Sequence, residues 1–133
     1  MLSVNWNALE AVLADKEVVV AAWVFGSAQE GQIGPQSDLD LGILFAHQPS
    51  LLELAELRDK LQQALQFDDI DVVVLNDASP ITRFEAVSGR MIYTRDAEEV
   101  ATFVSLTARE YEDSMALLRR GLVWRREAQE SSA

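Results

Sequence analysis

The chain contains no cysteine, so neither disulfide bonds nor thiolate metal ligands contribute to its structure. Its single histidine, His47, follows an apolar run, and we interpret it as a loop residue rather than a catalytic one. The longest unbroken apolar run, Val18 to Phe25, is far too short to cross a bilayer. No basic segment followed by an apolar one opens the sequence, so no signal peptide is predicted. We therefore expect a soluble, cytoplasmic protein.

Positive charge is also scarce in this chain. Lys and Arg number 11 against 22 Asp and Glu, which gives a formal net charge of −11. Such an excess opposes direct binding of nucleic acid, because that binding depends on basic side chains that neutralise phosphates. It still permits a small anionic substrate held through Mg²⁺, since the cation inverts the local field. It also suits docking on a basic protein partner.

Helical and extended patterns alternate along the 133 residues, which predicts a single domain of the α/β (α+β) class. We expect a core over about residues 1–95 and a helical segment over about 96–128. The final apolar stripe fits one long helix to about residue 127 or two helices broken near Gly121. The expected helices are residues 3–15, 28–31, 80–87 and one that begins at 51, and the expected strands are residues 18–25, 38–45, 67–75 and 91–94.

The most informative stretch is Gly26-Ser27, followed after ten residues (28–37) by Asp38-Leu39-Asp40. Gly26 ends an apolar strand that has the pattern of a strand covered on both faces. Asp38 and Asp40 open a second such strand, and residues two apart on a strand share a face. Two carboxylates on one face of a buried strand are costly unless a cation lies between them. A hard divalent cation, which prefers carboxylate oxygen, is the expected partner.

A third carboxylate, Asp71, lies in the predicted strand 67–75, on the same face as Val73 and Leu75. If the two aspartate-bearing strands are neighbours, Asp38, Asp40 and Asp71 meet at one place. This is the arrangement that phosphoryl or nucleotidyl transfer with two metal ions requires. We predict that Asp38 and Asp40 bind both metals, and that Asp71 completes the metal site and accepts the proton of the attacking hydroxyl.

Gly26-Ser27 supplies the complementary half of this predicted site. A glycine after a strand lets the backbone approach a phosphate closely, and backbone N–H groups at the start of a helix bind anions. The Ser27 hydroxyl can donate to a phosphate oxygen, and we include Ser37, which precedes Asp38, among the nucleotide-binding candidates. Taken singly, the Gly-Ser turn, the Asp-x-Asp pair and Asp71 each have a purely structural interpretation. Their combination in this order favours the functional one.

With these residues in place, the sequence resembles the minimal nucleotidyltransferases of the DNA polymerase β-like superfamily. It is most similar to the MNT-type antitoxins that are paired with HEPN-domain toxins. The resemblance implies a mixed β-sheet flanked by helices and Mg²⁺-dependent transfer of AMP from ATP to a tyrosine of the toxin, an RNase that is thereby silenced. It extends over nearly the whole chain and includes Asp71 to Asp77, Ser79-Pro80, Gly89 to Tyr93, Arg95-Asp96 and Arg109 to Tyr111.

One position departs from the family pattern. Where the family commonly has an arginine before the glycine that follows Gly-Ser, this chain has Glu30 before Gly31. A negative charge there is expected to weaken nucleotide binding. A compensating cation has to come from elsewhere, and the candidates are Lys60, Arg83, Arg90, Arg95 and Arg109.

Two other functions remain open from the sequence alone. The chain could neutralise a basic HEPN partner by contact without catalysis, or it could transfer a nucleotide to a small hydroxylated molecule. Against the second, related small-molecule enzymes usually carry an additional acceptor domain, for which 133 residues leave little room. Trp124 with Arg125 and Arg126 lies beyond the apolar stripe, and these residue types are enriched at interfaces, so we predict a partner contact there.

Overall fold

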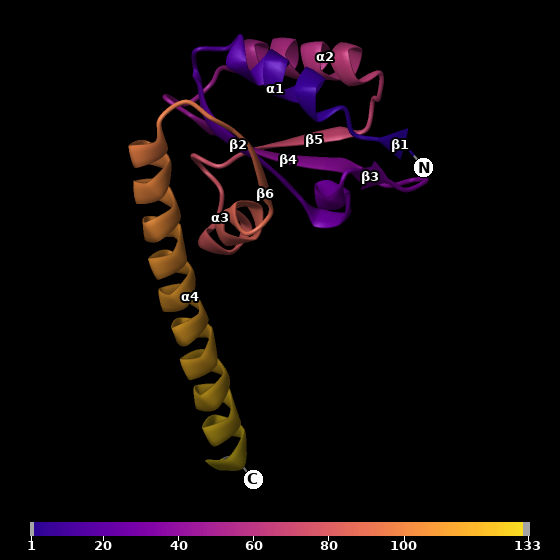
Figure 1. Ribbon diagram of the computed structural model, residues 1–133. Helices are drawn as coiled ribbons and strands as arrows, with labels where there is room; N and C mark the ends of the chain where they lie inside the picture. Colours follow the sequence, from indigo (N-terminus) through magenta and orange to yellow (C-terminus); the bar gives the residue numbers. More distant parts are fainter. Residues whose placement is uncertain (1, 132–133) are drawn as a thin grey trace.

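The computed structural model describes the backbone of residues 2–131 and the side chains of residues 3–121 (Figure 1). The helices and strands that the sequence predicts are present, together with two short strands that it does not predict. Their bounds, in chain order, are β1 Leu2–Ser3, α1 Trp6–Ala14, β2 Val19–Phe25, the 3₁₀ helix η1 Gly26–Glu30, β3 Gln32–Ile33, β4 Leu39–Phe45, α2 Leu51–Leu65, β5 Ile70–Val74, α3 Pro80–Val87, β6 Arg90–Thr94 and α4 Ala97–Ser131.

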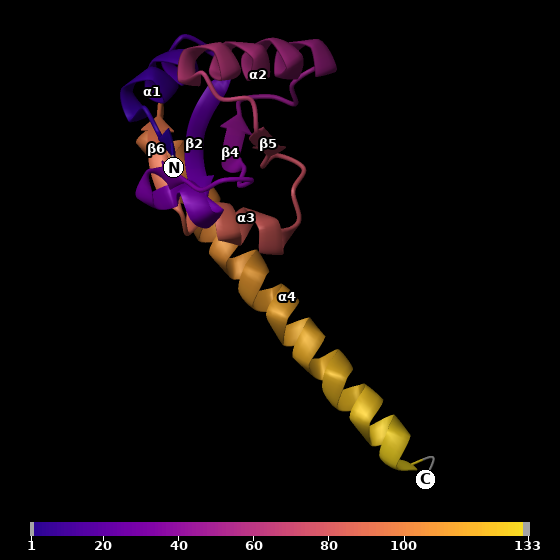
Figure 2. The same ribbon diagram turned by 90° about the vertical axis from the view of Figure 1, so that its right-hand side faces the viewer.

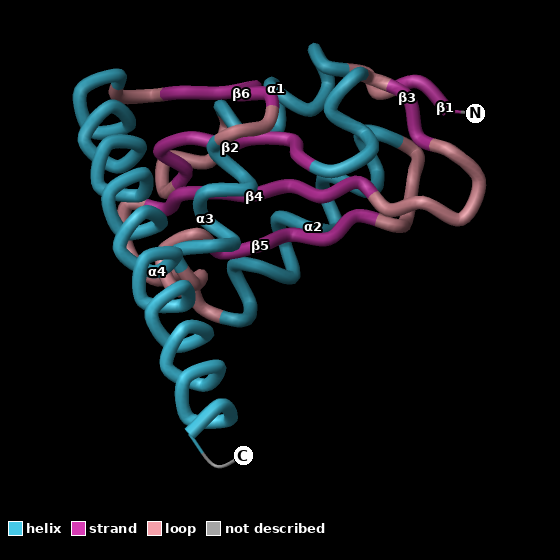
Figure 3. Tube along the Cα trace, turned by 90° about the horizontal axis from the view of Figure 1, so that it is seen from below, coloured by secondary structure: helices cyan, strands magenta, loops and turns pink. Residues whose placement is uncertain are grey.

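A four-stranded mixed sheet with the order β5-β4-β2-β6 forms the centre of the molecule (Figure 3). Strand β2 is antiparallel to both β4 and β6, whereas β4 and β5 are parallel. The short strands β1 and β3 pair separately as a two-stranded ribbon. The expected mixed sheet flanked by helices is confirmed.

Helices cover both faces of the sheet (Figures 1 and 2). On one face, α1 and α2 pack on a core that includes Leu9, Leu61 and Leu41. On the other face, α3 and the first part of α4 pack on a second core, which includes Trp23 and Val100. This double covering explains why β2 is apolar at consecutive positions, since neither face of the strand meets water.

Polar caps fix where the helices begin. Asn5 accepts a hydrogen bond from the Ala8 amide, so α1 starts at Trp6 rather than at residue 3. Ser50 and Glu53 form the predicted capping box of α2. Asp96 accepts from the first-turn amides of α4, as its position before the apolar stripe indicates. The sequence therefore specifies these boundaries locally.

Strand β5 starts at Ile70, three residues later than the sequence pattern suggests. Helix α2 ends at Leu65, and Gln66, which caps it, has a left-handed backbone (φ 52°). The Gln62 side chain then donates to the Asp68 carbonyl at 2.9 Å, and the Ile70 amide donates to the same carbonyl. The polar turn therefore occupies residues that were expected to be extended.

Helix α4 is a single helix, so of the two alternatives the unbroken one is correct. With 35 residues it is on the order of 50 Å long and projects well past the sheet (Figures 1 and 2). Val100, Phe103 and Thr107 pack against the domain, whereas Leu117 and Leu118 are 65% and 52% exposed. The predicted contact residues Trp124, Arg125 and Arg126 lie outside the residues whose side chains are described.

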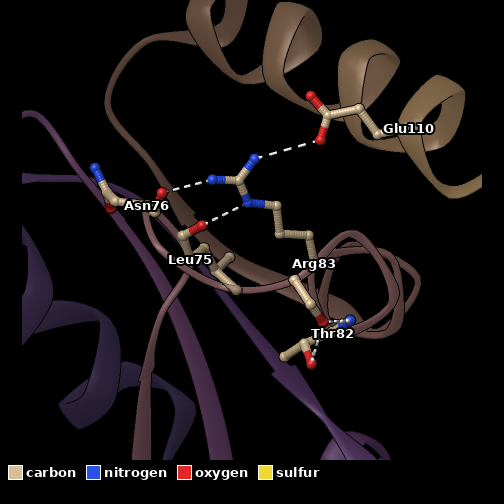
Figure 4. Close-up of polar contacts among 6 residues, drawn as sticks. Leu75, Asn76, Thr82, Arg83 and Glu110 are labelled. Atoms are coloured by element: carbon tan, nitrogen blue, oxygen red, sulfur yellow. Dashed lines mark hydrogen bonds and ion pairs between the residues drawn. The ribbon is translucent and has the colours of Figure 1, made fainter. Parts of the chain in front are cut away.

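Arg83 fastens α3 to the end of β5 and to α4 (Figure 4). Its Nε donates to the Leu75 carbonyl at 2.7 Å and one Nη donates to the Asn76 carbonyl at 2.5 Å. The other Nη lies 3.5 Å from the Glu110 carboxylate on α4. Because the guanidinium is only 19% exposed, its backbone contacts are expected to contribute more than the ion pair.

Arg83→Met is expected to lower the free energy of unfolding by about 1.5–3 kcal/mol, because it leaves two carbonyls without their charged donor. Glu110→Gln, which removes only the ion-pair charge, is expected to cost less than about 1 kcal/mol. Urea unfolding of both variants measures the difference. Equal losses would mean that the ion pair, and not the backbone contacts, holds α3 in place.

Candidate active site

The turn after β2 is built around Gly26. Its φ of +72° is in the left-handed region, which favours glycine. A Cβ atom at this position would lie 2.5 Å from the Asp40 carboxylate oxygen Oδ2. Gln29, one turn further along η1, donates to the Gly26 carbonyl at 3.2 Å. Gly26 is therefore required twice, once for the backbone conformation and once to make room for the carboxylate.

The strand register brings Asp40 beside two elements of the predicted site. Asp40 is paired with Phe25, the last residue of β2, and also with Asp71 in the parallel strand β5. Leu39 and Leu41 belong to the core on the α1/α2 side, so Asp40 lies on the opposite face, as the alternation predicts. Asp38 precedes β4 by one residue and is exposed.

Asp40 experiences electrostatic repulsion from the other two carboxylates, Asp38 and Asp71. Burial, followed by the negative charges of Asp71 and Asp38, raises the pKa of Asp40 above its ordinary value. In residues 3–121, no three acidic or imidazole side chains converge closely enough to form a complete cation site by themselves. Asp38, Asp40 and Asp71 are thus neighbours that repel one another, rather than a finished set of ligands.

This donor set fits a hard divalent cation. All three groups offer carboxylate oxygen, the ligand that Mg²⁺ prefers. Burial is the main cause of the raised pKa of Asp40, and the further rise caused by the charges of Asp71 and Asp38 is of the kind that a cation between the carboxylates removes. Asp38, Asp40 and Asp71 are therefore the residues that would hold such an ion.

A cavity of about 520 Å³ lies directly beside Gly26 and Asp40. Its wall includes Phe84 of α3 and Tyr111 of α4, whose rings stack with centroids 3.9 Å apart and planes inclined by 9°. Phe84 is not among the predicted site residues, and Tyr111 is named only within the stretch Arg109 to Tyr111 of the family resemblance, because nothing local links two rings on different helices. The cavity is also lined by Phe25, Gln29, Ile81, Glu85, Ser88 and Gly89.

The two candidate serines are placed differently. Ser27 is exposed in η1, next to Gly26, where the sequence suggested it. Ser37 is in the loop before β4, where its amide donates to the Gly34 carbonyl at 3.2 Å. It lines a separate cavity of about 260 Å³ together with Gly34 and Phe67. Ser27 therefore lies in the turn directly after Gly26, whereas Ser37 lines a different cavity.

Among the cations considered as substitutes for the missing arginine, Arg90 lies at the site end of the sheet. It is paired with Val24 near the end of β2, and its guanidinium lies over the Trp6 ring, 4.0 Å from the centroid. Trp6 in turn borders Gly31, which closes the turn that holds Glu30. Through Trp6, Arg90 is thus the candidate that these contacts place near the turn that holds Glu30.

The other four candidate cations lie elsewhere. Arg83 fastens α3, as described above, and Arg109 is exposed on α4. Arg95 is at the opposite end of β2, where it donates to the Val19 carbonyl at 3.1 Å. Lys60 on α2 meets Lys16, which lowers the pKa of Lys16.

The comparisons with known proteins agree with this geometry. A family model described as polymerase beta, nucleotidyltransferase matches residues 7–98, and the chain belongs to this family. Among curated proteins, no sequence matches the chain. The resemblance inferred from Gly26-Ser27 and the three aspartates is confirmed at the level of the family.

Solved structures extend the likeness to nearly the whole chain. A chain of a toxin-antitoxin crystal structure with AMP-PNP is 26% identical, with a TM-score of 0.74 over 90% of this chain and 95% of that one. A chain of the complex between tri-AMPylated Shewanella oneidensis HEPN toxin and MNT antitoxin is 24% identical, with a TM-score of 0.69 over 90% and 92%. A chain of a MntA-HepT toxin-antitoxin structure is also 24% identical, with a TM-score of 0.69 over 90% and 93%.

Within its described residues, the structure has no helix that is both long enough and apolar enough to span a membrane.

Proposed function

We propose that this protein is the antitoxin of a HEPN/MNT toxin-antitoxin pair and that it transfers AMP from ATP to a tyrosine hydroxyl of its HEPN toxin. The observation that carries the proposal is Asp40, which lies between the Gly26 turn and Asp71 and lines a cavity of about 520 Å³. Family membership and the structural likeness to toxin-antitoxin complexes support it. The compartment we propose is the cytoplasm, where ATP and Mg²⁺ are available.

The reaction is a substitution at the α-phosphorus of ATP. The acceptor hydroxyl oxygen forms a bond to the α-phosphorus, and the bond from that phosphorus to the α,β-bridging oxygen breaks. Pyrophosphate leaves with the electron pair, and Asp71 accepts the hydroxyl proton. Gly26 backbone and the Ser27 hydroxyl hold the phosphates. Bound Mg²⁺, with two ions proposed, supplies neutralisation of the phosphate charge.

The cavity beside Asp40 is suited to the nucleoside part of ATP. Its volume of about 520 Å³ is within the range typical of small-molecule sites. Ile81 and the stacked rings of Phe84 and Tyr111 provide the apolar surface on which a base can stack.

Tyr111→Ala is expected to raise the KM for ATP by about tenfold, because base stacking on an aromatic ring is worth roughly 1–3 kcal/mol. Tyr111→Phe keeps the ring and is expected to leave the KM nearly unchanged. Steady-state kinetics with varied ATP and a fixed toxin concentration measures both. An unchanged KM in Tyr111→Ala would place the base outside this cavity.

The partner surface that we propose includes the projecting part of α4. Leu117 and Leu118 expose large apolar side chains on a helix that extends beyond the sheet. Together with the net charge of −11, they suit a stable hetero-oligomer with a basic toxin. The proposal includes no direct contact with nucleic acid and no membrane association.

A binding-only antitoxin is the second candidate, and Glu30 favours it. This carboxylate is exposed at the end of η1, the turn that is expected to face the triphosphate. The stoichiometry of neutralisation separates the two candidates. An enzyme silences the toxin's ribonuclease activity at a small fraction of equimolar concentration and only with MgATP, whereas a binder needs one copy for each site and no ATP.

A further inference from the structure

Two contacts join α3 to α4 at consecutive positions of both helices. Arg83 on α3 lies 3.5 Å from the Glu110 carboxylate on α4. The next residue of each helix, Phe84 and Tyr111, belongs to the ring stack, with centroids 3.9 Å apart. Successive side chains of a helix point about 100° apart. One contact alone would let either helix rotate about its own axis, whereas two contacts in different directions fix the rotation of α4 relative to α3.

The Arg83 end of this arrangement is held by the sheet (Figure 4). Its guanidinium donates to the Leu75 and Asn76 carbonyls, which follow the end of β5. Asn76 is itself bonded to Phe45, the last residue of β4: its side-chain amide donates to the Phe45 carbonyl at 2.8 Å, and its side-chain oxygen accepts from the Phe45 amide at 2.9 Å. The position of the guanidinium is therefore set by the ends of two strands.

The two stacked rings depend on this arrangement to different degrees. Phe84 belongs to α3, which contacts β2 and β4 of the sheet directly. Tyr111 is on the part of α4 that leads away from the domain, and Leu117 and Leu118 further along are exposed. The place of the Tyr111 ring is therefore set by how α4 is held, and the ion pair to Glu110 lies immediately beside it.

We infer that Arg83 is a positioning residue for the nucleotide: through Glu110 it sets the rotation of α4 and so holds the Tyr111 ring against Phe84, where the base stacks. Phe84 and Tyr111 line the cavity beside Asp40, and neither Arg83 nor Glu110 is among the described residues that line it. Arg83 and Glu110 thus act on the nucleotide through Tyr111. This inference rests on the proposed function and adds which residues keep the base-binding surface assembled.

Glu110→Lys tests the inference, because it places a like charge against the Arg83 guanidinium. Glu112→Lys is the matched control, since it makes the same change of charge on the same helix. Glu112 is exposed, and its side chain points about 200° around α4 from that of Glu110. Calorimetry without the toxin measures the Kd of each variant for MgATP and for magnesium tripolyphosphate, which offers phosphates but no base.

Glu110→Lys is expected to weaken the binding of MgATP by about five- to tenfold, because base stacking is lost. Its Kd for magnesium tripolyphosphate is expected to stay within about twofold of the wild type, whereas a general loss of structure would weaken both ligands equally. The added positive charge cannot cause this result, since it attracts both anions. Glu112→Lys is expected to match the wild type with both ligands. Glu110→Gln is the milder variant, with an expected loss of about threefold for MgATP alone.

The same substitution in the Tyr111→Ala protein shows whether the effect passes through this ring. There Glu110→Lys is expected to change the Kd for MgATP no further, because the side chain through which it acts is gone. An undiminished effect in the Tyr111→Ala protein would overturn the inference, and so would equal weakening of MgATP and magnesium tripolyphosphate. Absence of AMP transfer by a wild type that binds MgATP would overturn the proposed function alone.

Discussion

Replacing Asp38 and Asp40 together with asparagine is expected to abolish AMP transfer to the toxin while the protein remains folded. The two carboxylates are expected to hold the cations that neutralise the triphosphate, and an amide carries no charge with which to do so. A loss of about 4 kcal/mol of transition-state stabilisation corresponds to a rate lower by about a thousandfold. The rate of label transfer from α-³²P-ATP to the toxin, compared between the wild type and the double variant, measures a loss of this size.

The stability of the same double variant shows whether it remains folded. The pKa of Asp40 is raised in the folded protein, so its ionised form is less stable there than in the unfolded chain. The folded state is therefore favoured below the unfolded pKa and loses this contribution as pH rises through the folded pKa. At neutral pH, Asp40→Asn removes this cost, and the Tm of the variant is expected to be at least that of the wild type. Retained transfer by a folded double variant would contradict the assigned role.

Gly26→Ala is expected to have the second largest effect. The left-handed φ of +72° costs a residue with a Cβ roughly 1–2 kcal/mol. The new methyl group would also lie 2.5 Å from Asp40 Oδ2, so the carboxylate has to rotate away from its place beside the turn. We expect AMP transfer to fall by about a hundredfold or more, since a displacement of about 1 Å at a reacting group costs that much.

Gly121→Ala is the matched control for this substitution. A Cβ at Gly121 meets nothing within 4 Å, and the residue lies inside α4. Alanine there is expected to stabilise the protein by about 0.5–1 kcal/mol without touching Asp40 or the turn at Gly26. Thermal unfolding and the transfer assay on both variants separate a local effect at the site from a general effect of losing a glycine. Wild-type transfer by Gly26→Ala would mean that the position of Asp40 is not critical.

The strands that carry the site could be predicted because their signals are local. An apolar run that stops at Gly26 specifies a strand covered on both faces, and the alternation around Asp40 specifies which side its carboxylate takes. The helix starts follow equally local rules, as Asn5 and Ser50 show. Each of these features depends on neighbours in the sequence, so a single sequence contains the information.

The features that escaped prediction depend on contacts between distant elements. The stack of Phe84 on Tyr111 exists only because α3 and α4 lie side by side, and neither ring stands out within its own helix. Ser37, which was also a nucleotide-binding candidate, lies in the loop before β4 and lines another cavity, a placement that only the folded loop reveals. The sequence left open whether α4 breaks at Gly121. The helix continues through this residue, because one glycine costs a helix only about 1 kcal/mol and the rest of the helix outweighs that cost.

The measurement that tests the central claim most directly is the intact mass of the HEPN toxin that we propose as the partner of this chain. The toxin is incubated with this protein, Mg²⁺ and ATP, and with the Asp38→Asn, Asp40→Asn variant in parallel. We expect a mass gain of one or more AMP units with the wild type and none with the variant. An unchanged toxin mass, in a mixture where the two proteins form a stable complex, would contradict this expectation and would establish neutralisation by binding alone.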